Sequence, residues 1–105
     1  MKTKLLVLSW ACLLLTGGQL YSVNQMELIN TLYGEFNGSW FGEQVVSMDY
    51  NGDGYDDVIV HAPNWNPNGV YNNGQCWGKI YFYWGGPNMD NIPDFVMEGT
   101  QNWEL

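Results

Sequence analysis

The sequence has few basic residues and few cysteines. Only three of its 105 residues are lysine or arginine, against 11 aspartates and glutamates, which gives a formal net charge of −8. A chain this acidic repels nucleic-acid phosphates and anionic membrane surfaces, so we expect neither as a partner. There are two cysteines, and only Cys76 lies outside the N-terminal apolar segment. A single thiol cannot form an intrachain disulfide, so we expect Cys76 to be buried as a small apolar residue.

Familiar catalytic motifs are also missing. The sequence contains no G-x-S-x-G, H-E-x-x-H, C-x-x-C or phosphate-binding glycine motif. The only histidine, His61, has no serine or cysteine partner motif, which favours a structural role. Asp49, Asp53 and Asp57 could imitate a glycosidase acid–base pair, but their spacing suits a shared ion better. We therefore predict that the chain is not an enzyme.

The one long apolar run lies at the N-terminus. Lys2 and Lys4 flank its start, residues 5–15 form the apolar core, and residues 16–18 are small enough for cleavage. This pattern predicts a secretory signal peptide at residues 1–18, too short for a membrane span. Cleavage after Gly18 is expected, and a later site such as Ser22 stays open. The remaining chain would be secreted or lie at the cell surface, with no membrane span.

The most informative segment is the acidic loop at residues 49–57, DYNGDGYDD. Side-chain oxygens fall at loop positions 1, 3, 5 and 9, from Asp49, Asn51, Asp53 and Asp57. A glycine at position 6 lets the backbone turn sharply around an ion. Oxygen ligands at this spacing favour a hard divalent cation, and Ca²⁺ fits best. Crowded carboxylates would repel one another without a cation.

Two other interpretations of this loop are an EF-hand and a solvated turn. An EF-hand needs a bidentate glutamate at position 12, where this sequence has Val60, and it needs flanking helices. The flanks here, residues 44–48 and 57–61, are β-branched runs typical of strands. Aspartate, asparagine and glycine also dominate ordinary turns, which is the simpler alternative. We favour an ion held in a strand–loop–strand hairpin.

The rest of the chain alternates short strand patterns with turn-rich loops. Strands are expected at residues 40–48, 57–61, 78–84 and 94–98, while residues 26–33 are ambiguous between a strand and a short helix. This predicts an all-β fold in which four consecutive antiparallel strands form a single β-propeller blade, as part of a larger propeller. A weak echo supports a repeat, because residues 32–35 resemble residues 97–100 and each is followed by a tryptophan, Trp40 and Trp103.

Several of these residues resemble a known repeat. Phe41-Gly42, the acidic loop, Ala62-Pro63 and residues 78–81 together resemble the FG-GAP repeat, the blade unit of integrin α-subunit propellers. His61 departs from the pattern, where the family has glycine. The resemblance implies Ca²⁺ as the cofactor and five ligands, with side-chain oxygens from four residues and the backbone carbonyl of Tyr55; the full set is Asp49, Asn51, Asp53, Tyr55 and Asp57.

The resemblance also implies a division of the chain and a set of partners. Residues 19–37 would belong to a partial preceding blade or linker, residues 38–99 to the FG-GAP-like blade, and residues 100–105 to the start of the next repeat. A lone blade exposes edges and apolar faces, so the expected partners are other propeller blades of the same or another chain. An extracellular protein or carbohydrate ligand is also possible.

Several aromatic residues bear on the question of that ligand. Trp65 and Tyr71 lie in the long loop at residues 64–75 and suit either sugar stacking or packing, whereas Tyr81, Tyr83 and Trp84 favour packing between blades. The predicted function is a secreted Ca²⁺-binding propeller module with a structural or adhesive role. An accessory, non-catalytic domain of a secreted polysaccharide- or lipid-cleaving enzyme is the alternative, and a functionless remnant is a third hypothesis.

Overall fold

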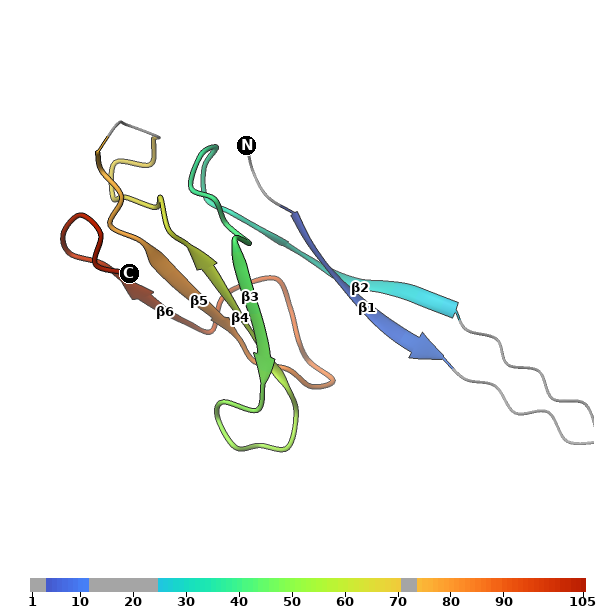
Figure 1. Cartoon of the computed structure of the whole chain (residues 1–105). Helices are drawn as coiled ribbons and strands as arrows, with labels where there is room; N and C mark the ends of the chain where they lie inside the picture. Colours follow the sequence, from blue (N-terminus) through green and yellow to red (C-terminus); the bar gives the residue numbers. More distant parts are fainter. Residues whose placement is uncertain (1–3, 12–24, 71–73) are drawn as a thin grey trace, which may run out of the picture.

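The computed structural model describes residues 4–11, 25–70 and 74–105. These residues form strands and turns, with no helix among them. Accordingly, this part of the chain holds no helix with the length and apolar character to cross a bilayer. The strands make one two-stranded and one four-stranded sheet, and the two-stranded ribbon extends away from the four-stranded sheet (Figure 1). The expected all-β fold is confirmed.

The four-stranded sheet is an antiparallel meander. Its strands are β3 (Gln44–Met48), β4 (Asp57–Ala62), β5 (Lys79–Tyr83) and β6 (Phe95–Glu98), and their order in the sheet is their order in the chain. Each neighbouring pair is antiparallel. This is the arrangement of a propeller blade, as the sequence predicts.

Residue choice explains where these strands begin and end. β3, β4 and β5 are rich in β-branched and aromatic side chains, which fit a pleated, half-buried surface. Pro63 follows β4 and cannot donate a ladder hydrogen bond. The first strand starts four residues later than the expected residue 40. Trp40 has a φ of 59° and Gly42 a φ of 91°, so the chain turns there instead of extending.

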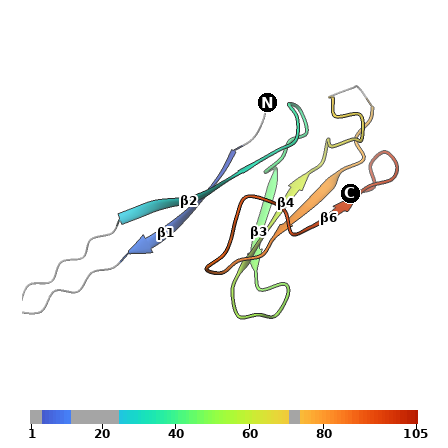
Figure 2. The ribbon, with the colours of Figure 1, turned by 180° about the vertical axis from the view of Figure 1, so that it is seen from behind.

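The two-stranded sheet pairs β1 (Lys4–Ala11) with β2 (Gln25–Tyr33) in antiparallel register. Residues 26–33, ambiguous in sequence, are therefore a strand. β1 falls inside the segment expected to be a signal peptide, while residues 12–18 and both candidate cleavage sites lie outside the described residues. Seen from behind, β2 runs on into the connector that leads to β3 (Figure 2).

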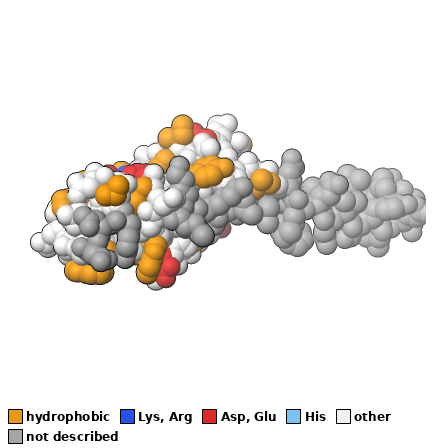
Figure 3. Space-filling model, turned by 90° about the horizontal axis from the view of Figure 1, so that it is seen from above, with side chains coloured by type: hydrophobic (Ala, Val, Ile, Leu, Met, Phe, Trp, Pro, Cys, Tyr) orange, Lys and Arg blue, Asp and Glu red, His pale blue; other side chains and the backbone are white. Residues whose placement is uncertain are grey.

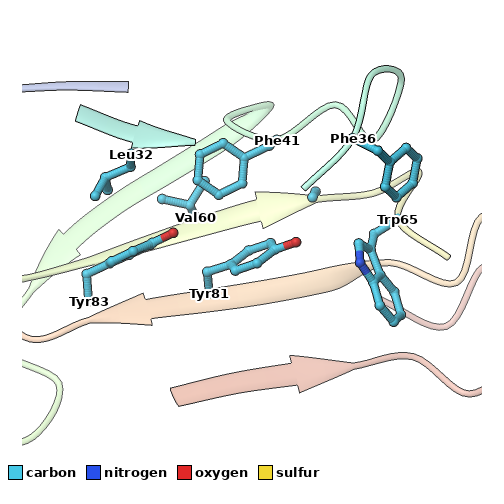
Figure 4. Close-up of a cluster of buried hydrophobic side chains, with 8 residues drawn as sticks. Leu32, Phe36, Phe41, Val60, Trp65, Tyr81 and Tyr83 are labelled. Carbon is cyan, nitrogen blue, oxygen red and sulfur yellow. The ribbon is translucent and has the colours of Figure 1, made fainter. Parts of the chain in front are cut away.

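The core lies between β2 with its connector and one face of the four-stranded sheet, which we name the inner face. Register places Val60 opposite Tyr81 and Val58 opposite Tyr83, so these side chains share that face. Leu32 of β2 is fully buried there (Figure 4). The full cluster of buried side chains is Leu32, Phe36, Phe41, Val60, Ala62, Trp65, Tyr81 and Tyr83.

Phe41 packs the β2–β3 connector onto the blade. It is fully buried, and its ring meets Tyr81 edge-on with centroids 5.1 Å apart. Gly34 makes room for it, because a Cβ on Gly34 would lie 2.6 Å from Cβ of Phe41. The connector is thereby fixed on the inner face.

The opposite face of the sheet, the outer face, has little cover. By strand alternation it carries apolar side chains from all four strands, and Val46, Phe95 and Met97 there are 51%, 48% and 42% exposed. Phe82 is the exception, since Tyr50, Trp84 and Phe95 pack around its ring. Hydrophobic side chains are visible on the surface of the blade in Figure 3. An exposed apolar face of this kind marks a surface that packs against something else.

Candidate functional site

The acidic loop joins β3 to β4 at one end of the blade. Its two glycines are required by backbone conformation, because Gly52 and Gly54 have φ values of 77° and 91°. A Cβ at either position would meet no other atom, so space is not the constraint. Residues with side chains rarely adopt such φ values. The glycines thus let a short loop fold back on itself, as the sequence predicts for Gly54 at position 6.

Asp49 lies at the centre of that fold. Its Oδ1 accepts hydrogen bonds from the backbone N–H groups of Gly52 and Asp53 at 2.9 and 3.1 Å. Its Oδ2 accepts one from Gly54 at 2.9 Å. Three consecutive amides therefore point at one carboxylate. The loop is organised around this side chain.

Asn51, Asp53 and Tyr55 form the exposed rim of the loop. Oδ1 of Asn51 accepts from the backbone N–H of Asp53 at 3.2 Å, and Oδ1 of Asp53 accepts from that of Tyr55 at 2.9 Å. The side chains of Asn51 and Asp53 meet directly, with Nδ2 of Asn51 3.4 Å from Oδ2 of Asp53. Asp53 and Tyr55 also line a cavity of about 300 Å³, together with Trp84.

Asp57 is the buried residue that anchors the loop. Its side chain is fully buried, and its Oδ2 accepts from the backbone N–H groups of Tyr50 and Asn51 at 2.9 and 3.2 Å. Its Oδ1 accepts from the N–H of Gly85 at 2.8 Å, which joins the loop to the end of β5. Gly85 has to be glycine, because a Cβ there would collide with the carbonyl oxygen of Asp56.

The donor chemistry of the loop fits Ca²⁺. Carboxylate, amide and carbonyl oxygens are the ligands that this hard cation prefers. A carboxylate that accepts amide hydrogen bonds keeps further lone pairs free for an ion. The three carboxylates are not brought to one point, however. Within the described residues no three Asp, Glu, His or Cys side chains gather closely enough to hold a metal. The metal site at Asp49, Asn51, Asp53, Tyr55 and Asp57 therefore stays a prediction.

A second polar cluster, which the sequence did not reveal, sits on the inner face. The ammonium of Lys79 is almost fully buried, with Nζ 2.5 Å from Oε1 of Glu35 and 2.8 Å from Oε1 of Glu98. It also lies over the rings of Trp65 and Tyr81, 4.7 and 5.1 Å from their centroids. The indole N–H of Trp65 donates to Oε2 of Glu35 at 2.7 Å. This cluster ties the β2–β3 connector to β5 across 44 positions of sequence.

Burial and charge shift the pKa values in this cluster. Burial works to raise the pKa of Glu35, but hydrogen bonds from Lys79 and Trp65 outweigh it and hold that pKa below its usual value. Burial works to lower the pKa of Lys79, yet its two carboxylate partners hold it above the usual range. Burial, followed by the nearby charge of Glu35, raises the pKa of Tyr81 and raises that of Tyr83 to about 12.

The aromatic candidates fall into two groups. Trp65 is 6% exposed and belongs to the core, so packing and not sugar stacking is its role. Tyr81 and Tyr83 are buried in the same core, whereas Trp84 is half-buried on the other face and stacks on Tyr50. Tyr71 lies outside the described residues. Cys76 is buried, as expected.

Comparison with known proteins identifies the same region. Residues 41–77 match the model of the FG-GAP repeat. Integrin alpha-5 of Xenopus laevis is 31% identical over 70 residues, which cover 67% of this chain and 7% of that protein. Human integrin alpha-8 is 41% identical over 58 residues, covering 55% of this chain and 6% of its own length.

An enzyme is also among the relatives. The phosphatidylinositol-glycan-specific phospholipase D of Dictyostelium discoideum is 41% identical over 44 residues, which cover 42% of this chain and 5% of that protein. The chain thus spans only a small part of each of these relatives. None of the solved protein structures matches it significantly.

Proposed function

This chain carries an FG-GAP repeat, and from that premise we propose that it is a secreted Ca²⁺-binding β-propeller blade with a structural or adhesive role. The observation that carries the proposal is the loop at residues 49–57. It combines oxygen donors of the right type with a preformed backbone around Asp49 and a buried anchor at Asp57. An ordinary solvated turn does not need a fully buried carboxylate that three amides hold.

Calcium would act as a staple between β3 and β4. Asp49, Asn51, Asp53 and Asp57 would supply side-chain oxygens, and Tyr55 its backbone carbonyl. An ion there offsets the repulsion among carboxylates that are close in sequence. Because the loop backbone is ordered only in the folded chain, an ion that binds there would stabilise the folded state, by about 2.7 kcal/mol at a hundredfold excess over Kd. No catalytic role is proposed.

Further blades are the proposed structural partners. The chain makes a similar backbone turn, or corner, before β3 and after β6. Trp40 lies in the first corner and Trp103 in the second, and they are the only described non-glycine residues with positive φ, at 59° and 64°. After the first corner Phe41 is packed on the inner face, and after the second Leu105 lines a cavity on the outer face. Units of this build would therefore follow one another with the outer face of one against the inner face of the next.

The location and ligand follow from the same premise. A signal peptide at residues 1–18 would export the chain, and the integrin relatives favour an adhesive setting at the cell surface. The phospholipase relative favours the second candidate, an accessory non-catalytic domain of a secreted enzyme. In both cases the blade binds or positions other molecules and performs no chemistry itself.

Calorimetric titration of the purified protein with Ca²⁺ tests the metal proposal. We expect one ion per chain, and we expect Asp53→Asn to lower the affinity at least tenfold because it removes a charged ligand from the rim. Asp56→Asn is the matched control, since Asp56 is the adjacent exposed aspartate outside the proposed ligand set. Equal heats of Ca²⁺ binding from the wild type and Asp53→Asn would show that the acidic loop is not the binding site.

A further inference from the structure

The cavity of about 300 Å³ beside the acidic loop lies at one end of the blade, between two loops. Because the strands form an antiparallel meander, the acidic loop and the β5–β6 loop leave the sheet at the same end (Figure 1). Tyr55 comes from the first loop, while Trp84 and Asn88 come from the second. Cavities that hold small ligands begin at about this size. The blade joint proposed above uses the faces of the sheet, so it leaves this end open.

Two aromatic side chains line the cavity, and both are held in place. The ring of Tyr55 lies against Gly86, since a Cβ on Gly86 would be 3.4 Å from that ring. Trp84 stacks on Tyr50, with ring centroids 6.2 Å apart and planes 10° from parallel. Tyr55 is nevertheless 51% exposed, and Trp84 is half-buried. Unlike the aromatic residues of the core, these two have surface left for a ligand.

The β5–β6 loop is fixed by contacts with β2 and with the core. The carbonyl oxygen of Met89 accepts a hydrogen bond from Nδ2 of Asn30 at 2.9 Å, and the side chain of Met89 packs against the core cluster. Its two neighbours, Asn88 and Asp90, line the cavity. A site whose lining is fixed before binding loses little entropy when it takes up a ligand.

The polar side chains of the cavity are mainly hydrogen-bond acceptors. They are one amide and three carboxylates, from Asn88, Asp53, Asp90 and Asp94. Oδ2 of Asp94 accepts from the backbone N–H of Trp84 at 2.7 Å, and Oδ1 of Asp90 accepts from that of Ile92 at 3.0 Å. Each carboxylate keeps further lone pairs for the donors of a ligand, and the amide can both donate and accept.

These groups restrict the class of ligand. The carboxylates repel an anion. An apolar ligand would cover the carboxylates without pairing them, which is costly. The carboxylates also lie apart, because in the described ranges no three acidic side chains come close enough together to hold a metal. Hydroxyl groups spread around a ring therefore reach several of them, whereas one compact cation would reach fewer.

We propose that this cavity binds a sugar unit of a neutral saccharide. The inference rests on the binding role proposed above and deepens it by naming a site and a ligand class. The C–H face of the sugar ring lies on the ring of Tyr55, where apolar and aromatic surfaces meet. The hydroxyl groups donate to the carboxylates of the two loops and pair with the amide of Asn88.

Isothermal titration calorimetry of the full chain tests the proposal. The probes are three neutral saccharides (cellotetraose, chitotetraose and mannotetraose), the anionic tetragalacturonate and the cationic peptide tetra-arginine. We expect at least one neutral saccharide to bind, and tetragalacturonate not to bind. Tyr55→Ala and Asn88→Ala, one from each loop, should each lower the saccharide affinity about tenfold.

Tyr33→Ala is the matched control. Tyr33 is a tyrosine of β2 outside the cavity, and it is 53% exposed, against 51% for Tyr55. It should bind the saccharide as the wild type does. Circular dichroism of each variant checks that it is folded, and Tyr55→Ala keeps the backbone carbonyl that is proposed to bind Ca²⁺.

Each titration is run in Ca²⁺ and again in EDTA, so that this proposal and the metal proposal fail separately. Saccharide binding in either condition, weakened in both cavity variants, supports the cavity even if Ca²⁺ itself does not bind. No binding of the three neutral saccharides in either condition overturns the cavity site and leaves the calcium titration unaffected. Saccharide binding that either cavity variant leaves unchanged, or that Tyr33→Ala weakens equally, also overturns it. Tetra-arginine that binds in place of the saccharides, and is lost in Tyr55→Ala, would make this a site for a cationic side chain instead.

Discussion

Asp57 offers the sharpest test of how the acidic loop is built, because it has a structural role apart from any ion. It is fully buried, and its two oxygens accept three backbone hydrogen bonds, from Tyr50, Asn51 and Gly85. Asp57→Asn keeps the shape of the side chain but replaces one acceptor oxygen with an N–H₂ group. That group must then face at least one backbone N–H.

The expected cost follows from those contacts. In the best orientation the remaining oxygen keeps Tyr50 and Asn51, and the new N–H₂ group opposes the N–H of Gly85. One charge-assisted hydrogen bond is lost, and both the N–H of Gly85 and the new N–H₂ group are left without an acceptor, which costs about 2–3 kcal/mol. For a domain of this size, 1 kcal/mol corresponds to roughly 4–8 °C in Tm. We therefore expect a drop of roughly 10–20 °C.

Thermal unfolding followed by circular dichroism, in excess EDTA, is the assay. The chelator removes any contribution from bound Ca²⁺, so only the hydrogen bonds are measured. Asp56→Asn serves as the control, because its exposed side chain should change stability by less than about 0.5 kcal/mol. If Asp57→Asn melts within a few degrees of Asp56→Asn, Asp57 is not the anchor that the structure indicates.

Three further predictions concern the polar cluster on the inner face. Lys79→Met should lower the free energy of urea unfolding by about 1–3 kcal/mol, because it leaves two half-exposed carboxylates without their cation. The free energy of unfolding should fall in acid as the pH drops through the lowered pKa of Glu35, and in base as the pH rises through the raised pKa of Lys79. Between the unfolded pKa values of 4.5 and 10.5 it should stay constant. An unfolding free energy that does not change from pH 3 to pH 6 would contradict the predicted loss of stability in acid. In an ultraviolet titration, Tyr83 should ionise only near pH 12, and complete tyrosine ionisation by pH 11 would be inconsistent with its burial.

Much of the blade could be predicted from the sequence because its signals are local. The aromatic run that forms β5, and the proline and glycines that end strands, act on their immediate neighbours. The glycine at position 6 of the acidic loop likewise indicates a backbone requirement, and Gly54 has the positive φ that this requires, as does Gly52. The start of β3 was predicted too early, since nothing local says that Trp40 adopts a positive φ.

The inner-face cluster could not be predicted for the opposite reason. Glu35 and Lys79 are 44 residues apart, and no periodicity links them. From the sequence, Trp65 suits either sugar stacking or packing, and the structure shows it buried because it packs in the core with residues of the connector after β2. Contacts between residues far apart in the sequence determine both the ion pair of Glu35 with Lys79 and the burial of Trp65. The positions of the loop oxygens around an ion also cannot be predicted from neighbouring residues alone, because they depend on the ion itself.

The central claim, a calcium-binding loop on a propeller blade, is tested most directly by terbium luminescence. Tb³⁺ occupies calcium sites of this ligand type, and Tyr50 and Tyr55 lie within the loop to sensitise its emission, with Trp84 stacked on Tyr50. We expect emission that saturates at one ion per chain, is displaced by Ca²⁺, persists in Asp56→Asn and is lost in Asp53→Asn. Sensitised emission that is absent, or equal in the two variants, would contradict the account.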